Sequence, residues 1–204
     1  LAHALREHAS LLDALEVVVP MDAAASLLPA LTELRSAAGI RIWLSKLRRH
    51  EDAKYDGSHY NHFINHGFVP AEHEQLGRLL QLPAARAALD GFVGRVALAR
   101  CAWTELGAWQ ALADRFDIGM AAHVRLAADN PAEPVKDDLA IANRVAQALL
   151  AAAGCPRLDV FLDTFCDVDR NYFAHHGLVD RRYDPRLAAH VLTNMHALLR
   201  EAGP

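Results

Sequence analysis

The chain has 204 residues, of which 52% are hydrophobic, and its formal net charge is -4. A chain of this size can bury a substantial core, and its charges form no basic stripe of the kind that binds a phosphate backbone, which argues against nucleic acid as a partner. No apolar run reaches the roughly 18 residues that a membrane-spanning helix needs, so we expect no membrane partner either.

The first half of the chain alternates between helix-like and strand-like segments. Leu1 to Ala14 has the composition of a helix, and Leu15 to Val19 is a β-branched run that predicts a strand. Met21 to Ala38 carries Ala and Leu at helical spacing and is followed by glycine, which predicts a helix that stops there. Ile40 to Leu47 alternates like a second strand, and we expect the next helix from about Pro70, since proline is favoured in a first turn.

The second half repeats this alternation. Hydrophobic and β-branched runs predict three further strands, at Arg95 to Ala102, Ile118 to Leu126 and Leu158 to Phe165. Helical spacing and capping residues predict the helices between and after them, at Ala108 to Arg115, from Asp137 or Asp138 to Ala153, and at Arg186 to Ala202.

The alternation of strands with helices predicts an α/β fold. Such units need crossover connections, so the strands should be parallel and the crossovers right-handed. The first strand-to-helix turn, VVVPMDAAAS, has no GxGxxG, which favours a parallel (β/α) TIM-barrel-like sheet over a doubly wound one. Because a complete barrel usually needs about 250 residues, we expect residues 1–204 to be a single partial barrel of about five units, the C-terminal portion of a longer chain.

In either architecture the ligand lies beyond the carboxyl ends of the strands. In the fifth predicted strand, Asp163 alternates with apolar residues and should point inward, and three more polar residues follow in the loop, namely Asp167, Asp169 and Arg170. Carboxylates so close together would form a functional cluster. The alternative is that they cap the loop and pair with arginines.

Two other strand ends carry candidate site residues. In the fourth strand His123 and Arg125 share one face, where they would orient an oxyanion or a sugar hydroxyl, unless His123 is a structural histidine. Glu105 follows Trp103 after the third strand, which suits a carboxylate acting as nucleophile or base beside an aromatic platform for a sugar. The alternative is that Glu105 stabilises the first turn of the next helix.

Histidines gather in two loops. His59, His62 and His66 have spacings that could place two imidazoles on one helical face, but no paired carboxylate accompanies them at the spacing of a known zinc motif, so we predict a substrate-binding or solvated loop and no metal site. Near Asp163, His175 and Tyr172 are candidates for lining the substrate pocket.

From Val160 the chain reads VFLDTFCDVDRNYFAHHGLVDRRYDPRLAAHVLTNMHALL. This segment resembles the last strand and helix of clan A glycoside hydrolase barrels, in which an aromatic and an acid at the strand end are followed by GLVD, a basic turn and Pro. Residues Trp103 to Gly107 resemble the segment that carries the nucleophile of the same clan. The resemblance implies a retaining glycosidase with Glu105 as nucleophile, in which two carboxyl groups lie about 5 Å apart.

Three hypotheses remain open from the sequence. The first is a carbohydrate-active hydrolase without cofactor, with Glu105 and Asp163 in its pocket and a small molecule or oligosaccharide as substrate. The second is a metal-dependent sugar isomerase or epimerase, in which Asp163, Glu105 and His123 bind a divalent metal ion. The third is a barrel without catalysis that serves as a binding module.

The three cysteines indicate in which cellular compartment the protein is expected. Cys101, Cys155 and Cys166 are odd in number and lack a CxxC spacing, which argues against a disulfide framework and a structural zinc site. We therefore expect inert thiols in a cytoplasmic protein.

Overall fold

The computed structural model describes residues 2–47, 66–127, 137–167 and 176–202. Its strands form one parallel sheet in the sequential order β1-β2-β3-β4-β5. The strands are β1 (Ala14–Val19), β2 (Arg41–Lys46), β3 (Gly91–Val96), β4 (Gly119–Val124) and β5 (Leu158–Leu162). The helices are α1 (Ala2–Glu7), the 3-10 helix η1 (Ala9–Leu11), α2 (Met21–Ala38), the 3-10 helix η2 (Pro70–Glu72), α4 (His73–Leu80), α5 (Pro83–Ala88), α6 (Ala102–Phe116), α7 (Asp138–Gly154) and α8 (Leu187–Ala202).

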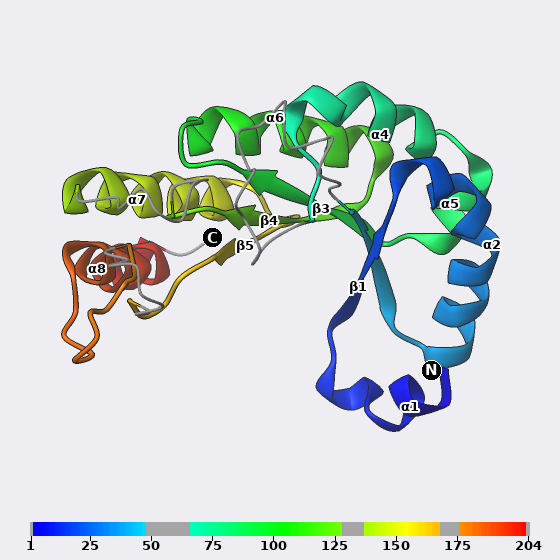
Figure 1. Ribbon diagram of the computed structural model, residues 1–204, viewed down its shortest axis with the longest axis horizontal. Helices are drawn as coiled ribbons and strands as arrows, with labels where there is room; N and C mark the ends of the chain where they lie inside the picture. The colour runs from blue at the N-terminus through cyan, green and yellow to red at the C-terminus, as the bar shows by residue number, and fades with distance from the viewer. Residues whose placement is uncertain (1, 48–65, 128–136, 168–175, 203–204) are drawn as a thin grey trace.

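The strand order confirms the predicted class of fold. A doubly wound sheet reverses its strand order at a switch point, whereas here each strand pairs with the next one along the chain. Successive right-handed crossovers in one direction put their helices on one face of the sheet. Figure 1 shows α2, α5, α4, α6 and α7 along the outer face of the curved sheet. The described chain is therefore a partial, TIM-barrel-like arrangement.

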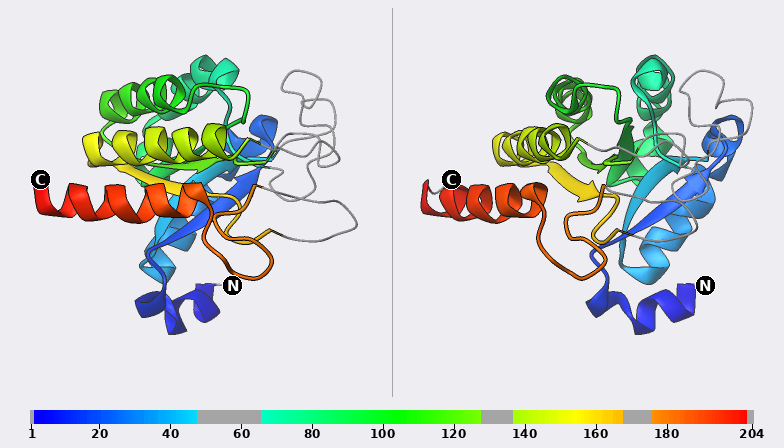
Figure 2. Two further views of the ribbon diagram at one scale, coloured as in Figure 1. Left: turned by 90° about the vertical axis from the view of Figure 1, so that its left-hand side faces the viewer. Right: turned by 60° about the vertical axis from the view of Figure 1, so that its left-hand side comes forward.

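Period two along each strand separates an outer face from a concave one. The outer side chains pack with the helices in the main hydrophobic core, which includes Ile42, Phe92 and Met120. A second hydrophobic cluster joins α7 to α8 through residues such as Ile141 and Ala188. In Figure 2 α8 extends away from the sheet with the C-terminus at its far end. In the described part of the chain, no helix is long and apolar enough to cross a membrane.

Most predicted elements are confirmed, but the third strand is wrong. The predicted segment Arg95 to Ala102 lies mostly in the connection to α6, and the real strand β3 begins at Gly91. Its glycines concealed it, because glycine is depleted in strands unless another group approaches closely. A Cβ at Gly91 would lie 2.7 Å from the carbonyl oxygen of Gly119, and one at Gly94 would lie 3.1 Å from the indole of Trp109.

Two helix predictions also need correction. The predicted helix from Leu1 to Ala14 is two short pieces, α1 and η1, and Ala14 already belongs to β1. The helix predicted over Ala108 to Arg115 is longer, because α6 begins at Ala102. By contrast, α2 has the predicted bounds and ends at Gly39, whose φ of 67° is a left-handed cap that glycine adopts without strain.

Candidate functional site

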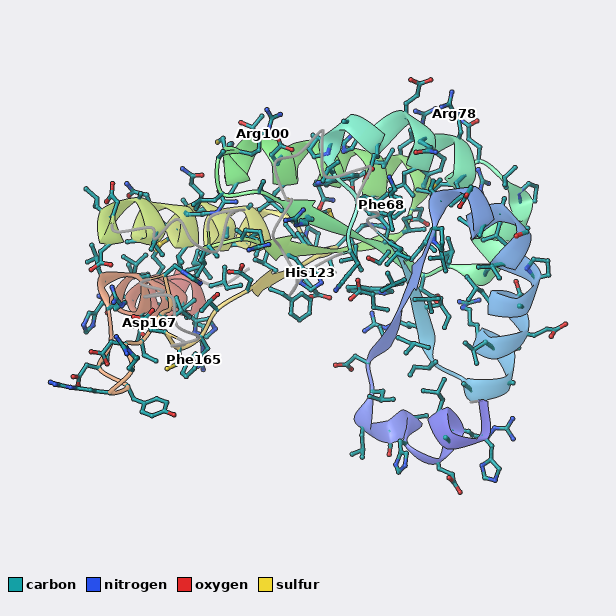
Figure 3. The ribbon with its side chains drawn as sticks, viewed as in Figure 1. Phe68, Arg78, Arg100, His123, Phe165 and Asp167 are labelled. Atoms are coloured by element: carbon teal, nitrogen blue, oxygen red, sulfur yellow. The ribbon has the colours of Figure 1, made fainter. Side chains whose placement is uncertain are left out.

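A carboxylate and two imidazoles meet on the concave face of the sheet. Oε1 of Glu16 lies 2.7 Å from Nδ1 of His66, and Oε2 of Glu16 lies 3.6 Å from Nε2 of His123. The two imidazole rings are nearly perpendicular, with their centroids 5.3 Å apart. Ser45 lies beside them, with its Oγ 3.4 Å from Nδ1 of His66. We call Glu16, His66 and His123 the Glu-His-His cluster; Figure 3 labels His123.

The segment 66–68 reaches the sheet between the diverging ends of β2 and β3. Gly67 donates its N–H to the carbonyl of Lys46, and Phe68 donates to Val93 while its own carbonyl accepts from Arg95. Gly67 has a φ of 105°, and a Cβ there would lie 2.9 Å from the Cβ of Arg95. Only glycine fits this backbone, so Gly67 allows the segment to present His66 to the concave face.

The contact between Glu16 and His123 depends on the curvature of the sheet. Glu16 is on β1 and His123 is on β4, with β2 and β3 between them. In a flat sheet, strands three positions apart are about 14 Å from each other, and their side chains stand parallel, so these two groups would not meet. A concave sheet tilts them toward one another, as the wall of a barrel does.

The cluster holds Glu16 in its ionised form. Burial acts to raise the pKa of the Glu16 carboxyl, but hydrogen bonds from His123, His66 and Ser45 outweigh it and hold that pKa well below its usual value. Glu16 is therefore an anion surrounded by donors, which suits a carboxylate that stabilises positive charge or binds a cation.

The cluster borders a hollow of about 710 Å³ on the concave face. Glu16 and His123 are part of its lining, together with the aromatic side chains of Trp43 and Phe161. Phe161 is half exposed, and its ring lies 5.7 Å from that of His123. Apolar and aromatic walls with a few convergent polar groups are the usual composition of a small-molecule site.

The structure does not bring the two predicted catalytic carboxylates together. Glu105 lies in the first turn of α6, where its Oε1 accepts a 2.9 Å hydrogen bond from Arg100. Asp163 forms a buried ion pair with Arg125 and also accepts from the backbone N–H of Leu126. The two carboxylates thus occupy separate ion pairs, and neither is among the residues that line the hollow.

The other predicted substrate-binding residues lie in different parts of the structure. Asp167 is buried and joins Arg186 and the N–H of Gly177, so it fixes the connection to α8. Trp103 lies on α6 and is 55% exposed. Of the predicted strand-end residues, only His123 lies in the Glu-His-His cluster. Four of the predicted residues lie outside the part of the chain that the structure describes, namely Asp169, Arg170, Tyr172 and His175.

Two residues of the cluster were missed or undervalued in the sequence. Glu16 interrupts the β-branched run LEVVV, and period two would have placed it on the face opposite Leu15 and Val17. A single charged residue within an otherwise apolar strand is the signal that could have identified it. The sequence predicts only a loop at His66, because the position of His66 depends on the insertion of 66–68 into the sheet.

No protein-family model matches the chain, and no curated protein matches it either. Among solved structures, a candidate alpha-L-fucosidase from Bacteroides thetaiotaomicron is similar, with 8% identity and a TM-score of 0.48 over 91% of this chain and 55% of that one. GH5_18 from Streptomyces cattleya in complex with GlcNAc has 13% identity and a TM-score of 0.36 over 100% of this chain and 76% of that one. This chain thus spans little more than half the length of the first. The fold assignment rests on strand order and pairing, and neither likeness assigns an activity.

Proposed function

We propose that this chain carries the active-site face of a (β/α)-barrel enzyme that hydrolyses a carbohydrate, with the Glu-His-His cluster as its centre. The observation that carries the proposal is the convergence of an ionised carboxylate and two imidazoles beside a hollow with aromatic walls. The resemblance of the segment from Val160 to glycoside hydrolase barrels supports the choice of a sugar as substrate.

The proposed roles follow from the charges of the groups. Glycoside cleavage passes through a transition state with positive charge at the anomeric carbon, and the Glu16 carboxylate would stabilise it. As the C–O bond breaks, a protonated His123 would give its proton to the leaving oxygen; water would then add its hydroxyl to the anomeric carbon and return its other proton to His123. His66 would act as a positioning residue through its contact with Oε1 of Glu16.

The experiment measures release of 4-nitrophenol from a panel of 4-nitrophenyl glycosides and of reducing ends from oligosaccharides. Glu16→Gln keeps the shape of the side chain and removes its charge, so we expect the rate to fall about 100-fold or more. Glu74→Gln is the matched control, because Glu74 lies exposed on α4 and should leave the rate unchanged. Melting curves of both variants show whether they fold.

Two results would contradict the proposal. One is no release by the unmodified protein across the panel, and the other is an unchanged rate in Glu16→Gln. The sequence-based assignment of Glu105 and Asp163 stays a prediction, and Glu105→Gln and Asp163→Asn belong in the same series. Loss of activity in those two variants with full activity in Glu16→Gln would favour that assignment over the one proposed.

A further inference from the structure

The Glu-His-His cluster has the composition of a metal site. Its three residues each offer one ligand atom, and these atoms all lie within 4.8 Å of one another. They come from β1, from the segment 66–68 and from β4, so three separately anchored pieces of backbone hold them. Each side chain is half-buried, with between 19% and 28% of its surface exposed, so its position is limited by packing.

The spacing of these atoms is close to what a tetrahedral ion requires. Zn–N and Zn–O bonds of about 2.0–2.2 Å place the ligand atoms of a tetrahedral site roughly 3.4 Å apart. Oε1 of Glu16 lies 2.7 Å from Nδ1 of His66, and its Oε2 lies 3.6 Å from Nε2 of His123, so each nitrogen is near that separation from a carboxylate oxygen. One ligand atom from each residue can be chosen so that all three lie within 4.8 Å of one another.

We infer that Glu16, His66 and His123 bind one divalent transition-metal ion of the Zn²⁺ class. Two imidazole nitrogens favour such an ion over Mg²⁺ and Ca²⁺, which prefer ligands made only of oxygen. Three protein ligands leave a fourth position for water or a substrate atom, which is the arrangement of catalytic rather than structural zinc sites. The hollow beside Glu16 and His123 gives a small molecule access to the cluster.

This inference rests on the three ligand atoms and not on the proposed hydrolase activity. With the ion bound, Glu16 and His123 would be ligands and could not take the roles proposed above, because an imidazole nitrogen that coordinates a metal carries no proton. It differs from the sequence-based alternative, in which Asp163, Glu105 and His123 bind the ion. Of those three residues only His123 is in the cluster, since Glu105 and Asp163 are paired with Arg100 and Arg125.

The test is direct metal binding. Protein freed of metal with a chelator is titrated with ZnCl₂ in a calorimeter and with CoCl₂ in a spectrophotometer. We expect one ion per chain and the visible absorption of four-coordinate Co²⁺. Each of Glu16→Gln, His66→Gln and His123→Gln should weaken binding at least tenfold.

The matched control is His3→Gln, because His3 is an exposed histidine on α1 and should leave binding unchanged. Absence of saturable binding would overturn the inference. So would binding that survives all three cluster substitutions, or binding that His59→Gln or His62→Gln removes while the cluster variants retain it.

Glycoside hydrolysis measured with and without Zn²⁺ separates this inference from the proposed function. Metal binding without hydrolysis would keep the metal site and remove the hydrolase, and would favour the isomerase or epimerase hypothesis. Hydrolysis by a protein that binds no metal would keep the hydrolase and overturn the metal site.

Discussion

Glu16 and Glu105 show how the neighbouring side chains determine the role that a carboxylate can take. Glu16 is surrounded by His66, His123 and Ser45 at the edge of a hollow, whereas Glu105 lies in the first turn of α6 and accepts from Arg100. Glu16 therefore borders space that a ligand can occupy, whereas Glu105 is not among the residues that line the hollow.

Gly67→Ala should disturb both stability and the cluster. The left-handed φ of 105° and the 2.9 Å approach to the Cβ of Arg95 both disfavour a methyl group, so we expect a loss of about 2 kcal/mol in the free energy of unfolding. Because Gly67 positions His66, metal affinity should fall with it. Urea denaturation and zinc titration measure the two effects.

Gly107→Ala is the control for this prediction. Gly107 lies within α6, and a Cβ there would meet no atom within 4 Å. Alanine in a helix is more stable than glycine by roughly 0.5–1 kcal/mol, so this variant should be slightly stabilised. Equal stability of the two alanine variants would show that the backbone at Gly67 is not strained.

At the scale of elements, α7 is tied to the strand ends by one side chain. Arg144 is buried and donates to the carbonyls of five residues, namely Val96, Ala97, Leu98, Arg100 and Arg125. These carbonyls lie at or just beyond the carboxyl ends of β3 and β4, and those of Val96 and Ala97 also accept backbone N–H groups from Arg125 and Arg100. Arg144 thus joins two strand ends to the helix that covers them.

Arg144→Leu should therefore be strongly destabilising. The carbonyls of Leu98, Arg100 and Arg125 would lose the guanidinium as donor, and each such loss costs about 1–3 kcal/mol, so we expect the free energy of unfolding to fall by about 3 kcal/mol or more. Arg78→Leu, on the exposed face of α4, should change it by less than about 0.5 kcal/mol. Similar losses in the two variants by urea denaturation would contradict the role of Arg144.

The packing of α4 against α6 predicts that the stability of the fold depends on pH. Burial lowers the pKa of His73, whose ring contacts that of Trp109 in a tilted arrangement at a centroid distance of 4.0 Å, while the charge of Glu105 acts in the opposite direction. A histidine whose pKa is lowered by folding takes up its proton more readily in the unfolded chain, so stability falls as pH drops below about 6.5. The free energy of unfolding should therefore decrease between pH 7.5 and 5.5.

His73→Gln isolates this contribution from that of the other histidines. The variant lacks the titrating group, so its stability should change less over the same pH interval. Denaturation curves at each pH measure the difference. An equal pH dependence in the variant and the unmodified protein would contradict the prediction.

At the scale of the whole molecule, the central strands of the sheet are more deeply buried and have more strand neighbours than the strands at its margins. All six residues of β3 are buried, whereas β5 alternates buried or half-buried residues with exposed ones. β1 and β5 each pair with only one neighbour in the described sheet. That residues 1–204 are part of a longer barrel stays a prediction.

Amide hydrogen exchange should be slower in the central strands than in the strands at the margins of the sheet. Amides of β3 and β4 have paired strands on both sides, so we expect them to exchange at least about tenfold more slowly than those of β5, a difference of about 1.4 kcal/mol in opening free energy. Exchange followed by mass spectrometry measures both segments in one sample. Slower exchange in β5 than in β3 would contradict the strand order.

The sequence by itself determined most of the local elements and the face of the strand on which His123 lies. Helical spacing and a glycine set the bounds of α2, and period two placed His123 on the concave side of β4, where it lines the hollow. These features depend on residues close together in the chain, where backbone geometry alone relates one side chain to the next.

Only the tertiary structure decided which groups meet. The contact of Glu16 with His66 joins residues 50 positions apart, and it requires the insertion of 66–68 between β2 and β3. The contact of Glu16 with His123 requires a curved sheet. The alternation of side chains along one strand is local. The curvature of the sheet depends on the twist and packing of every strand and helix, so no short segment of the sequence specifies it.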